Sequence, residues 1–302
     1  MASVPASIPL PRSEGAFAAW ITPVELALLG AIWGSSFLFM RIAAPEFGAL
    51  PLATVRLVLG ALALSPLLWF ARHRLPLSRW PQLALIGALN SAIPFALFAW
   101  AATRAPAGVS AITNSTTVLF TAVVAYFAFK EPIGLRRGFG LVLGFVGVTV
   151  LAVAGGRTSG PDVLYGAIAG TIAALCYALA VNLVRAKVAD LPMTAVAAAT
   201  LAASALMSAP FGIAAFPQTA ISTKAWLCAA AIGVLCTGIA YLIYFRLIGR
   251  VGPARAVTVT YLVPLFAVAW AWLVLGEPLT WPMGVAGALI LAGVSLAQAR
   301  RA

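Results

Sequence analysis

Apolar residues in this chain form long unbroken runs, and polar residues are confined to short segments between them. Strands of a membrane barrel would instead alternate lipid-facing and lumen-facing residues, so the pattern predicts helices. A bilayer-spanning helix needs about 20 consecutive apolar residues. We therefore predict an all-α polytopic membrane protein with ten transmembrane helices, at 22–43, 50–71, 81–103, 105–129, 135–154, 163–184, 193–215, 225–247, 253–275 and 282–298.

The segments between the runs are short and rich in arginine, glycine and proline, as at 72–76, 155–161 and 249–253. Prolines also interrupt the first 20 residues, so we expect a cytoplasmic tail at 1–21 rather than a cleaved signal peptide. A second short cytoplasmic tail is expected at 299–302.

Composition agrees with this reading, because 63% of the 302 residues are hydrophobic and only 9% are charged. Soluble domains carry about 25% charged residues. Ten spans leave no room for a large extramembrane domain. The three cysteines, Cys176, Cys228 and Cys236, lie singly in apolar runs without CxxC spacing, so we interpret them as packing residues.

The net charge of +12 is spread over the loops rather than gathered on one face, which argues against nucleic-acid binding. With the N-terminus inside, four basic residues fall on the outer side, namely Arg41, Arg104, Arg157 and Lys224, and Arg56 lies within a span. The other fourteen of the 19 fall on the cytoplasmic side. This asymmetry predicts an inner-membrane protein with both termini in the cytoplasm.

The two halves of the chain are related by an internal repeat. At an offset of 146 positions, Trp80 matches Trp226 and Glu131-Pro132 matches Glu277-Pro278; at an offset of 144, Trp33 matches Tyr177 and Arg41 matches Arg185. We therefore divide the chain into repeats at 22–156 and 157–298. Each repeat holds five spans, an odd number, so the second copy enters the membrane inverted, with a substrate site expected between the halves.

Several features of the chain occur together: the five-plus-five spans, the run Trp33-Gly34-Ser35-Ser36-Phe37 followed by Arg41, Arg56 in span two, and the two Glu-Pro turns. In these features the sequence, over about 22–298, resembles the EamA family of the drug/metabolite transporter superfamily. The resemblance implies a basket-like bundle with a central cavity and, in many members, export of amino acids or other small metabolites.

Polar groups inside the spans are the first candidates for lining that cavity. Pro94 and Pro264 each free the carbonyl four residues earlier, at Asn90 and Thr260, and Asn114 is the repeat counterpart of Thr260. We place Asn90, Asn114 and Thr260 in the substrate site, with Ser36 and Asn182. The alternative is that such residues only join neighbouring helices, at about 0.6 kcal/mol per hydrogen bond.

Aromatic residues are the second candidates, because pockets for amphiphilic ligands are mostly apolar. We assign Trp33, Trp100, Tyr177, Tyr244 and Tyr261 to the substrate site, with Tyr241 as a further aromatic of the lining. The alternative is an interfacial aromatic belt, which is the better interpretation of Trp69, Trp80, Trp226 and Trp281.

Charged residues within the spans are few. Arg56 is a candidate contact for a substrate anion, or else it reaches the outer interface or pairs with Glu46. Glu25 is the one carboxylate placed to carry a proton, unless it only complements a helix N-terminus. Glu131 and Glu277 precede prolines at span ends, where we assign them to chain reversal.

The sequence lacks the nucleophiles, acids and metal ligands of an enzyme: GxSxG, HExxH and GxxxxGK[ST] are all missing, and His73 lies in a basic loop. We predict no catalysis, no cofactor and no metal, and no need for an oligomer. The predicted function is transport of small metabolites, with export the expected direction, by alternating access across the bilayer. A passive channel or facilitator is the alternative, followed by a structural or signalling membrane protein.

Overall fold

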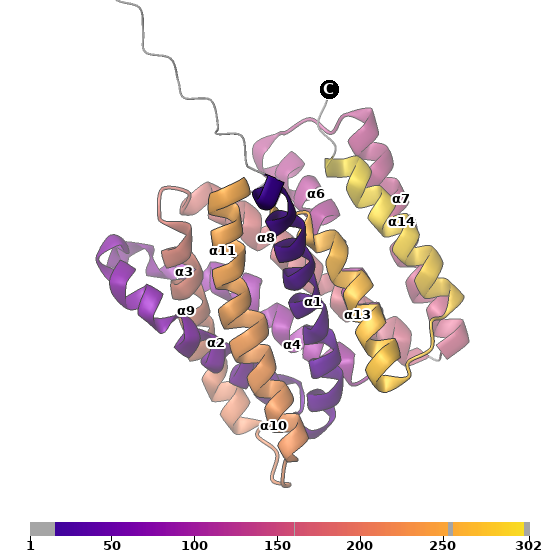
Figure 1. Cartoon of the computed structure of the whole chain (residues 1–302), viewed down its shortest axis with the longest axis horizontal. Helices are drawn as coiled ribbons and strands as arrows, with labels where there is room; N and C mark the ends of the chain where they lie inside the picture. The colour runs from indigo at the N-terminus through magenta and orange to yellow at the C-terminus, as the bar shows by residue number, and fades with distance from the viewer. Residues whose placement is uncertain (1–15, 160, 253–255, 299–302) are drawn as a thin grey trace, which may run out of the picture.

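The computed structural model describes residues 16–159, 161–252 and 256–298, and within these ranges the chain is helical, without strands. Figure 1 shows the helices packed as one bundle with their axes roughly aligned. The predicted tails fall outside the described residues over 1–15 and 299–302. Helix α1 begins at Ala16, six residues before the first predicted span, because the stretch Ala16–Trp20 is apolar and free of proline.

The helices of the first half follow the predicted runs. They are α1 (Ala16–Phe47), α2 (Ala49–Ala71), α3 (Trp80–Gly87), α4 (Ile93–Ala102), α5 (Ala107–Asn114), α6 (Thr117–Phe129) and α7 (Leu135–Ser159). The short segments η1 (Arg72–Arg74), η2 (Leu77–Arg79) and η3 (Ala88–Ala92) complete this half. The third run is therefore built from α3, η3 and α4, and the fourth from α5 and α6.

The second half repeats this order of long and interrupted helices. Its elements are α8 (Pro161–Lys187), α9 (Met193–Ala214), α10 (Thr223–Ala230), η4 (Ala231–Ile239), α11 (Ala240–Val251), α13 (Val259–Leu275) and α14 (Trp281–Gln298). In the described part of the chain, seven continuous helical stretches of 22 to 29 residues are long and apolar enough to cross a membrane. Shorter apolar helices lie at Val259–Leu275 and Trp281–Leu296. The protein therefore spans the membrane several times.

Two of these stretches contain π-helical turns at related places. The segment η3 occupies Ala88–Ala92, and a shift of 146 positions places it inside η4, at Ala231–Ile239. In η3 the amide of Ile93 donates to the carbonyl of Ala88, five residues earlier, so the helix is widened immediately before Pro94, which has no amide hydrogen to donate. The sequence predicted the irregularity at Pro94 but not the one in η4, which contains no proline. Such turns are often found at functional sites.

Small residues allow the helices to approach closely. A Cβ atom added to Gly34 of α1 would lie 2.8 Å from the backbone nitrogen of Ala267 in α13. In α8, a Cβ atom added to Gly170 would likewise overlap the side chain of Thr113 of α5. Helices α7 and α14 also pack side by side along their length (Figure 1).

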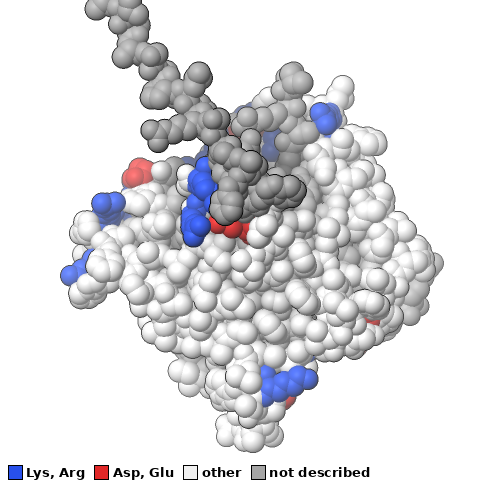
Figure 2. Space-filling view, in the orientation of Figure 1, with Lys and Arg blue, Asp and Glu red and all other residues white. Residues whose placement is uncertain are grey.

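Charged residues lie mainly at the two ends of the bundle. On the face shown in Figure 2, basic and acidic side chains gather at the upper end and along the lower edge, with an uncharged band between them. The lower end carries Gly48 and the loops 215–222 and 276–280, and the upper end carries the loops 130–134 and 188–192. An uncharged band of this kind is what hydrocarbon requires of a lipid-facing surface.

Candidate functional site

A buried arginine, Arg56, lies where five helical stretches converge, with η4 and α11 counted as one stretch. The guanidinium of Arg56, in α2, donates from Nε to Thr237 Oγ1 of η4 at 3.1 Å and from Nη1 to Met40 Sδ of α1 at 3.8 Å. Its Cζ lies 3.6 Å from the ring centre of Phe95 in α4. It also interacts electrostatically with Tyr177 of α8 and Tyr241 of α11. We refer to these six residues as the Arg56 cluster.

The π-helical geometry of η4 orients the partner of Arg56. Thr237 is fully buried, and its hydroxyl donates to the carbonyl of Ile232, five residues earlier, at 3.0 Å. With its proton used in this bond, the Thr237 oxygen is left to accept from Arg56. The wide turn therefore fixes the position of Thr237 and makes its hydroxyl oxygen the acceptor for Arg56.

Aromatic rings continue from the cluster into the bundle. The indole nitrogen of Trp33 donates to the carbonyl of Cys236 in η4 at 3.1 Å, and its ring lies 5.2 Å from that of Tyr244. Tyr177 stacks on Phe98 with ring centres 6.2 Å apart. Of the predicted aromatic residues, Tyr177 and Tyr241 therefore lie beside Arg56, and Trp33 and Tyr244 are connected to the cluster through η4.

Asn90 also joins this group. It lies in η3, half-buried, and its side chain lies near the hydroxyl of Tyr241 in the Arg56 cluster. Since Tyr241 belongs to the second half of the chain, the contact connects the two halves at the π-helical turn.

Other predicted polar residues bond to nearby backbone. The hydroxyls of Ser36 and Thr260 donate to carbonyls three residues earlier, at 2.6 and 2.8 Å. Asn114 ends α5, half-buried, with its carbonyl accepting from the Thr117 hydroxyl at 2.7 Å. Asn182 is buried and donates to Ala178 and, on α6, to the carbonyl of Thr121. Asn182 therefore joins α8 to α6, as the helix-joining alternative expects.

Two predicted aromatic residues lie away from the Arg56 cluster. Trp100, in α4, lies against the guanidinium of Arg104, 3.7 Å from its Cζ to the ring centre. Tyr261, in α13, packs with the core formed by α5, α7 and α14, near Ser295 of α14. The structure does not bring either of them to the other aromatic candidates.

The two acidic residues weighed in the sequence have basic or backbone partners. Glu25 lies 2.6 Å from Arg250 and 3.2 Å from Arg246, both in α11. Glu46 accepts from the amide and the hydroxyl of Ser222, at 2.6 and 2.8 Å, at the start of α10. The suggestion that Arg56 pairs with Glu46 is therefore wrong, because the N-terminus of α10 offers that carboxylate closer donors.

At the lower end, an ion pair connects the two halves. Arg41 Nε lies 2.9 Å from Glu277 Oε1, and Arg41 Nη1 donates to the carbonyl of Ala102 at 2.7 Å. The amide of Ala107 donates to Glu277 Oε2 at 2.9 Å. The pair therefore ties α1 to the end of α4, the start of α5 and the end of α13.

At the upper end, the repeat counterparts of these residues form a second ion pair. Arg185 Nη1 lies 2.5 Å from Glu131 Oε1, and Arg137 lies 4.0 Å from the same carboxylate. Within the described residues, Arg185 makes no hydrogen bond to α11. The carbonyl of Ile248, the counterpart of Ala102, instead accepts from the amide of Gly252. We call Arg41–Glu277 and Arg185–Glu131 the crossed ion pairs.

Sequence reasoning missed these pairs, although it found their four members. It assigned Glu131 and Glu277 to chain reversal only, and that assignment is incomplete because each glutamate binds an arginine of the other half. The signal was available: arginines and glutamates that match at nearly the same offset are able to pair reciprocally. Met40, Phe95 and Thr237 carried no comparable signal, since single apolar and hydroxyl residues are common in every span.

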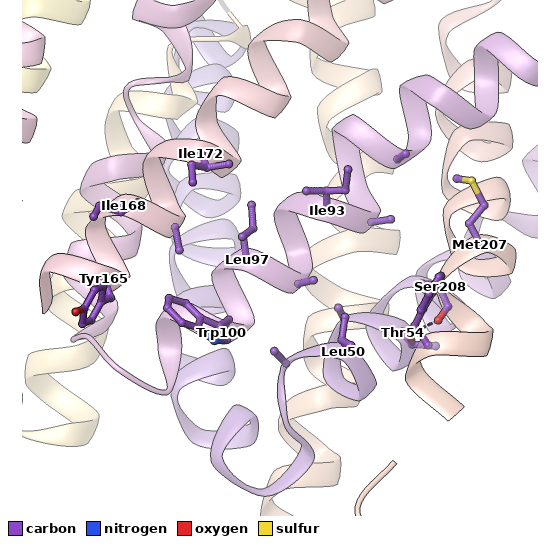
Figure 3. A pocket seen from close by; sticks show the side chains of 17 residues that line it. Leu50, Thr54, Ile93, Leu97, Trp100, Tyr165, Ile168, Ile172, Met207 and Ser208 are labelled. Carbon is purple, nitrogen blue, oxygen red and sulfur yellow. Dashed lines mark hydrogen bonds between the residues drawn. The ribbon is translucent and has the colours of Figure 1, made fainter. Parts of the chain in front are cut away.

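An apolar groove opens on the side of the bundle between α2, α4, α8 and α9. It has a volume of about 660 Å³, and Figure 3 shows Ile93 and Leu97 of α4 between Ile168 of α8 and Met207 of α9. Of the predicted site residues only Trp100 lines this groove. Its exposed aliphatic side chains are those expected at a lipid-facing surface.

Comparison with known proteins identifies the family. A model of the EamA-like transporter family matches residues 22–153 and again residues 164–298. The chain belongs to the EamA-like transporter family. The two matched segments correspond to the two related halves, and members of this family are membrane-embedded transporters of small molecules.

Named relatives match along most of their length. A protein of Streptantibioticus cattleyicolor named "Probable terminal-alkyne amino-acid exporter" is 26% identical over 279 residues, covering 91% of this chain and 92% of that protein. The inner membrane transporter YedA of Escherichia coli, itself uncharacterized, is 29% identical over 251 residues, covering 80% and 79%. One solved crystal structure shares the fold of this EamA-like transporter, with a TM-score of 0.61, 19% identity, and coverage of 90% and 95%.

Proposed function

We propose that this protein is an alternating-access carrier, exporting small metabolites such as amino acids, and that it works through two inverted repeats of five spans each. The repeats are 22–156 and 157–298, and both termini lie in the cytoplasm. The excess of arginine and lysine in the loops of the upper end supports the orientation, with the upper end inside. A role as a carrier involves no catalytic step, no cofactor and no metal.

The observation that carries this proposal is the relation between the crossed ion pairs. Arg41 and Glu277 meet at one end of the bundle, while their repeat counterparts Arg185 and Glu131 meet at the other. A repeat related by a two-fold axis in the membrane plane produces this arrangement, because the axis exchanges both the halves and the ends. The two π-helical turns, η3 and η4, follow the same relation.

The two ends differ in how tightly they are held, and this difference defines a conformation. At the lower end α1 packs on α4 and α5, and the Arg41–Glu277 pair bonds to both. At the upper end α8, the counterpart of α1, makes no comparable packing on α11, the counterpart of α4, among the described residues. In our proposal the outer end is closed and the cytoplasmic end is the one free to open, and transport exchanges these roles.

The amino-acid class of substrate is supported by the relative from Streptantibioticus cattleyicolor and by the buried chemistry. Its name, "Probable terminal-alkyne amino-acid exporter", describes a small molecule with charged groups and an apolar side chain. The Arg56 cluster offers a cation beside aromatic rings, which suits such a molecule. Trp33, Asn90, Tyr177 and Tyr244 are the further residues that we place at the substrate.

Counterflow in liposomes tests the function. The purified protein is reconstituted, the vesicles are loaded with one unlabelled amino acid from an aromatic and aliphatic panel, and uptake of a labelled trace is followed. A carrier gives uptake that saturates with concentration and is stimulated by the loaded amino acid. Flux that stays linear with concentration would favour a passive channel or facilitator, and the absence of flux for every solute would contradict a transport role.

A further inference from the structure

The positive charge of Arg56 has no counter-ion in the part of the chain that the structure describes. Within the described residues, no carboxylate lies within ion-pair distance of it. Glu25, Glu131, Asp190 and Glu277 pair with other arginines, and Glu46 binds Ser222. Asp162, the remaining described acid, is exposed in the first turn of α8. Each of these carboxylates is already bound elsewhere or faces away from the site.

The guanidinium is also buried away from water that could solvate its charge. Arg56 retains only 9% of its surface exposed, and Thr237 and Phe95 hold the head group against η4 and α4. An arginine that reached the membrane interface would instead extend its head group towards the end of α2. An unpaired buried charge costs several kcal/mol, so such a residue in a membrane protein marks a functional site.

The hydrogen bonds of Arg56 leave one edge of the guanidinium available. The group has five N–H donors; Nε uses its one on Thr237, and Nη1 directs one at the weak acceptor Met40 Sδ. Nη2 has no partner among the described residues. A carboxylate binds an arginine edge through two parallel N–H···O bonds, which is the contact that Nη1 and Nη2 together provide.

The surroundings of this edge are apolar and aromatic. Phe95 lies under the guanidinium, and the rings of Tyr177, Phe98 and Phe37 form a connected group beside it. Trp33 and Tyr244 form a second group, tied to η4 by the Trp33 indole. No described acidic side chain accompanies these rings, so the cluster carries a net positive charge and offers no carboxylate to a substrate ammonium.

We infer that Arg56 binds the carboxylate of the transported molecule, and that the substrates are organic acids with an apolar or aromatic body in which the amino group is dispensable. This inference rests on the proposed function, since it names the substrate group read at the carrier's site. Thr237 is a positioning residue, because it fixes the guanidinium from the side opposite to the free edge.

Three probes of matched size separate the charged groups. 3-Phenylpropionate carries the carboxylate alone, L-phenylalanine carries carboxylate and amine, and phenethylamine carries the amine alone. Each is titrated against the purified full chain in lipid nanodiscs, with the midpoint of thermal unfolding as the readout. We expect the two carboxylates to raise the midpoint in a saturable way and phenethylamine to leave it unchanged.

Variants assign the effect to Arg56. Arg56→Met is expected to abolish the stabilisation by both carboxylates, and Arg56→Lys to weaken their apparent affinity about tenfold, because an ammonium lacks the two-pronged edge. The matched control is Arg104→Met, which removes another arginine that lies over an aromatic ring, Trp100, outside the cluster. It should respond to the probes as the unmodified chain does.

The outcomes are distinct. Stabilisation by phenethylamine equal to that by 3-phenylpropionate, an unchanged response in Arg56→Met, or no response of the unmodified chain to either carboxylate would each overturn the inference. If Arg56→Met does not fold, Thr237→Val retains the charge and should weaken carboxylate binding severalfold; an unchanged affinity there overturns it as well. Saturable amino-acid counterflow with no dependence on Arg56 would leave the carrier standing and remove this inference alone.

Discussion

Arg41 and Glu277 lie 236 positions apart in the chain, in different halves, and their side chains meet at 2.9 Å. The same residue types, shifted by one repeat, meet again at the opposite end as Arg185 and Glu131. An ion pair at a partly exposed site contributes only about 0–1 kcal/mol by itself. The pairs therefore contribute little to stability, and in the proposed mechanism their role is to set the balance between two conformations.

The orientation of the chain can be tested by thiol labelling. On a background without the three native cysteines, single cysteines in the loops 72–80 and 184–192 should react only from the cytoplasmic side. Cysteines in 155–162 and 216–224 should react only from outside, as the charge asymmetry predicts. Equal labelling of all four loops from one side would contradict the inverted repeat.

Substitutions at Asn90 and Asn182 distinguish a residue that contacts the substrate from a residue that joins two helices. Asn90→Leu removes the polar side chain that lies near Tyr241 of the Arg56 cluster, and we expect about a tenfold weaker apparent affinity in counterflow with little change in thermal stability. Asn182→Leu removes the bond that joins α8 to α6 and a second bond to the Ala178 carbonyl within α8, and it should lower stability by about 1 kcal/mol, at roughly 0.6 kcal/mol per bond.

The reverse pattern, with Asn90→Leu unstable but fully active, would assign Asn90 to packing. Thr260→Val and Asn114→Leu extend the comparison. Because the Thr260 hydroxyl already bonds its own helix, its replacement should have a smaller effect on transport than that of Asn90.

Glu25 gives a prediction about energetics. Its carboxylate is engaged by Arg246 and Arg250, so we expect Glu25 to act as a structural ion pair and not as a coupling group. Liposomes loaded with substrate and given no pH gradient should therefore show flux, and Glu25→Gln should retain most of it. Loss of net transport with intact exchange in that variant would show that Glu25 is a coupling site.

The close approach of α1 and α13 depends on Gly34. Gly34→Val places a side chain against the backbone of Ala267 and should destabilise the protein by about 1–3 kcal/mol, as overpacking does. Gly284→Ala is the control, because a Cβ atom there meets nothing within 4 Å. Unfolding midpoints in detergent compare the two, and equal midpoints would show that the α1–α13 contact tolerates separation.

The sequence located the helices well, because each transmembrane stretch must be apolar over its whole length and hydrocarbon imposes this without reference to neighbours. It also singled out Trp33, Asn90 and Tyr177, through the repeat and through Pro94, and their role at the substrate stays a prediction. The contacts of Arg56 were beyond it, since Thr237 and Phe95 reach the guanidinium only after distant helices have packed. The π-helical turn in η4 carries no proline, so no local signal marked it.

The most direct test of the central claim, that the two ends open reciprocally, measures thiol reactivity at Ser110→Cys near the lower end and Ala256→Cys near the upper end. Both native residues are buried, and they are repeat counterparts.

In a background without native cysteines, Arg41→Glu should raise the rate at which a membrane-impermeant reagent modifies the thiol introduced at Ser110. It should lower the rate for the thiol introduced at Ala256, each by up to about fivefold for a pair worth at most ~1 kcal/mol. Arg185→Glu should do the opposite, and the swap Arg41→Glu with Glu277→Arg should restore the original rates. Rates that change in the same direction at both positions, or at neither, would contradict alternating access through the crossed ion pairs.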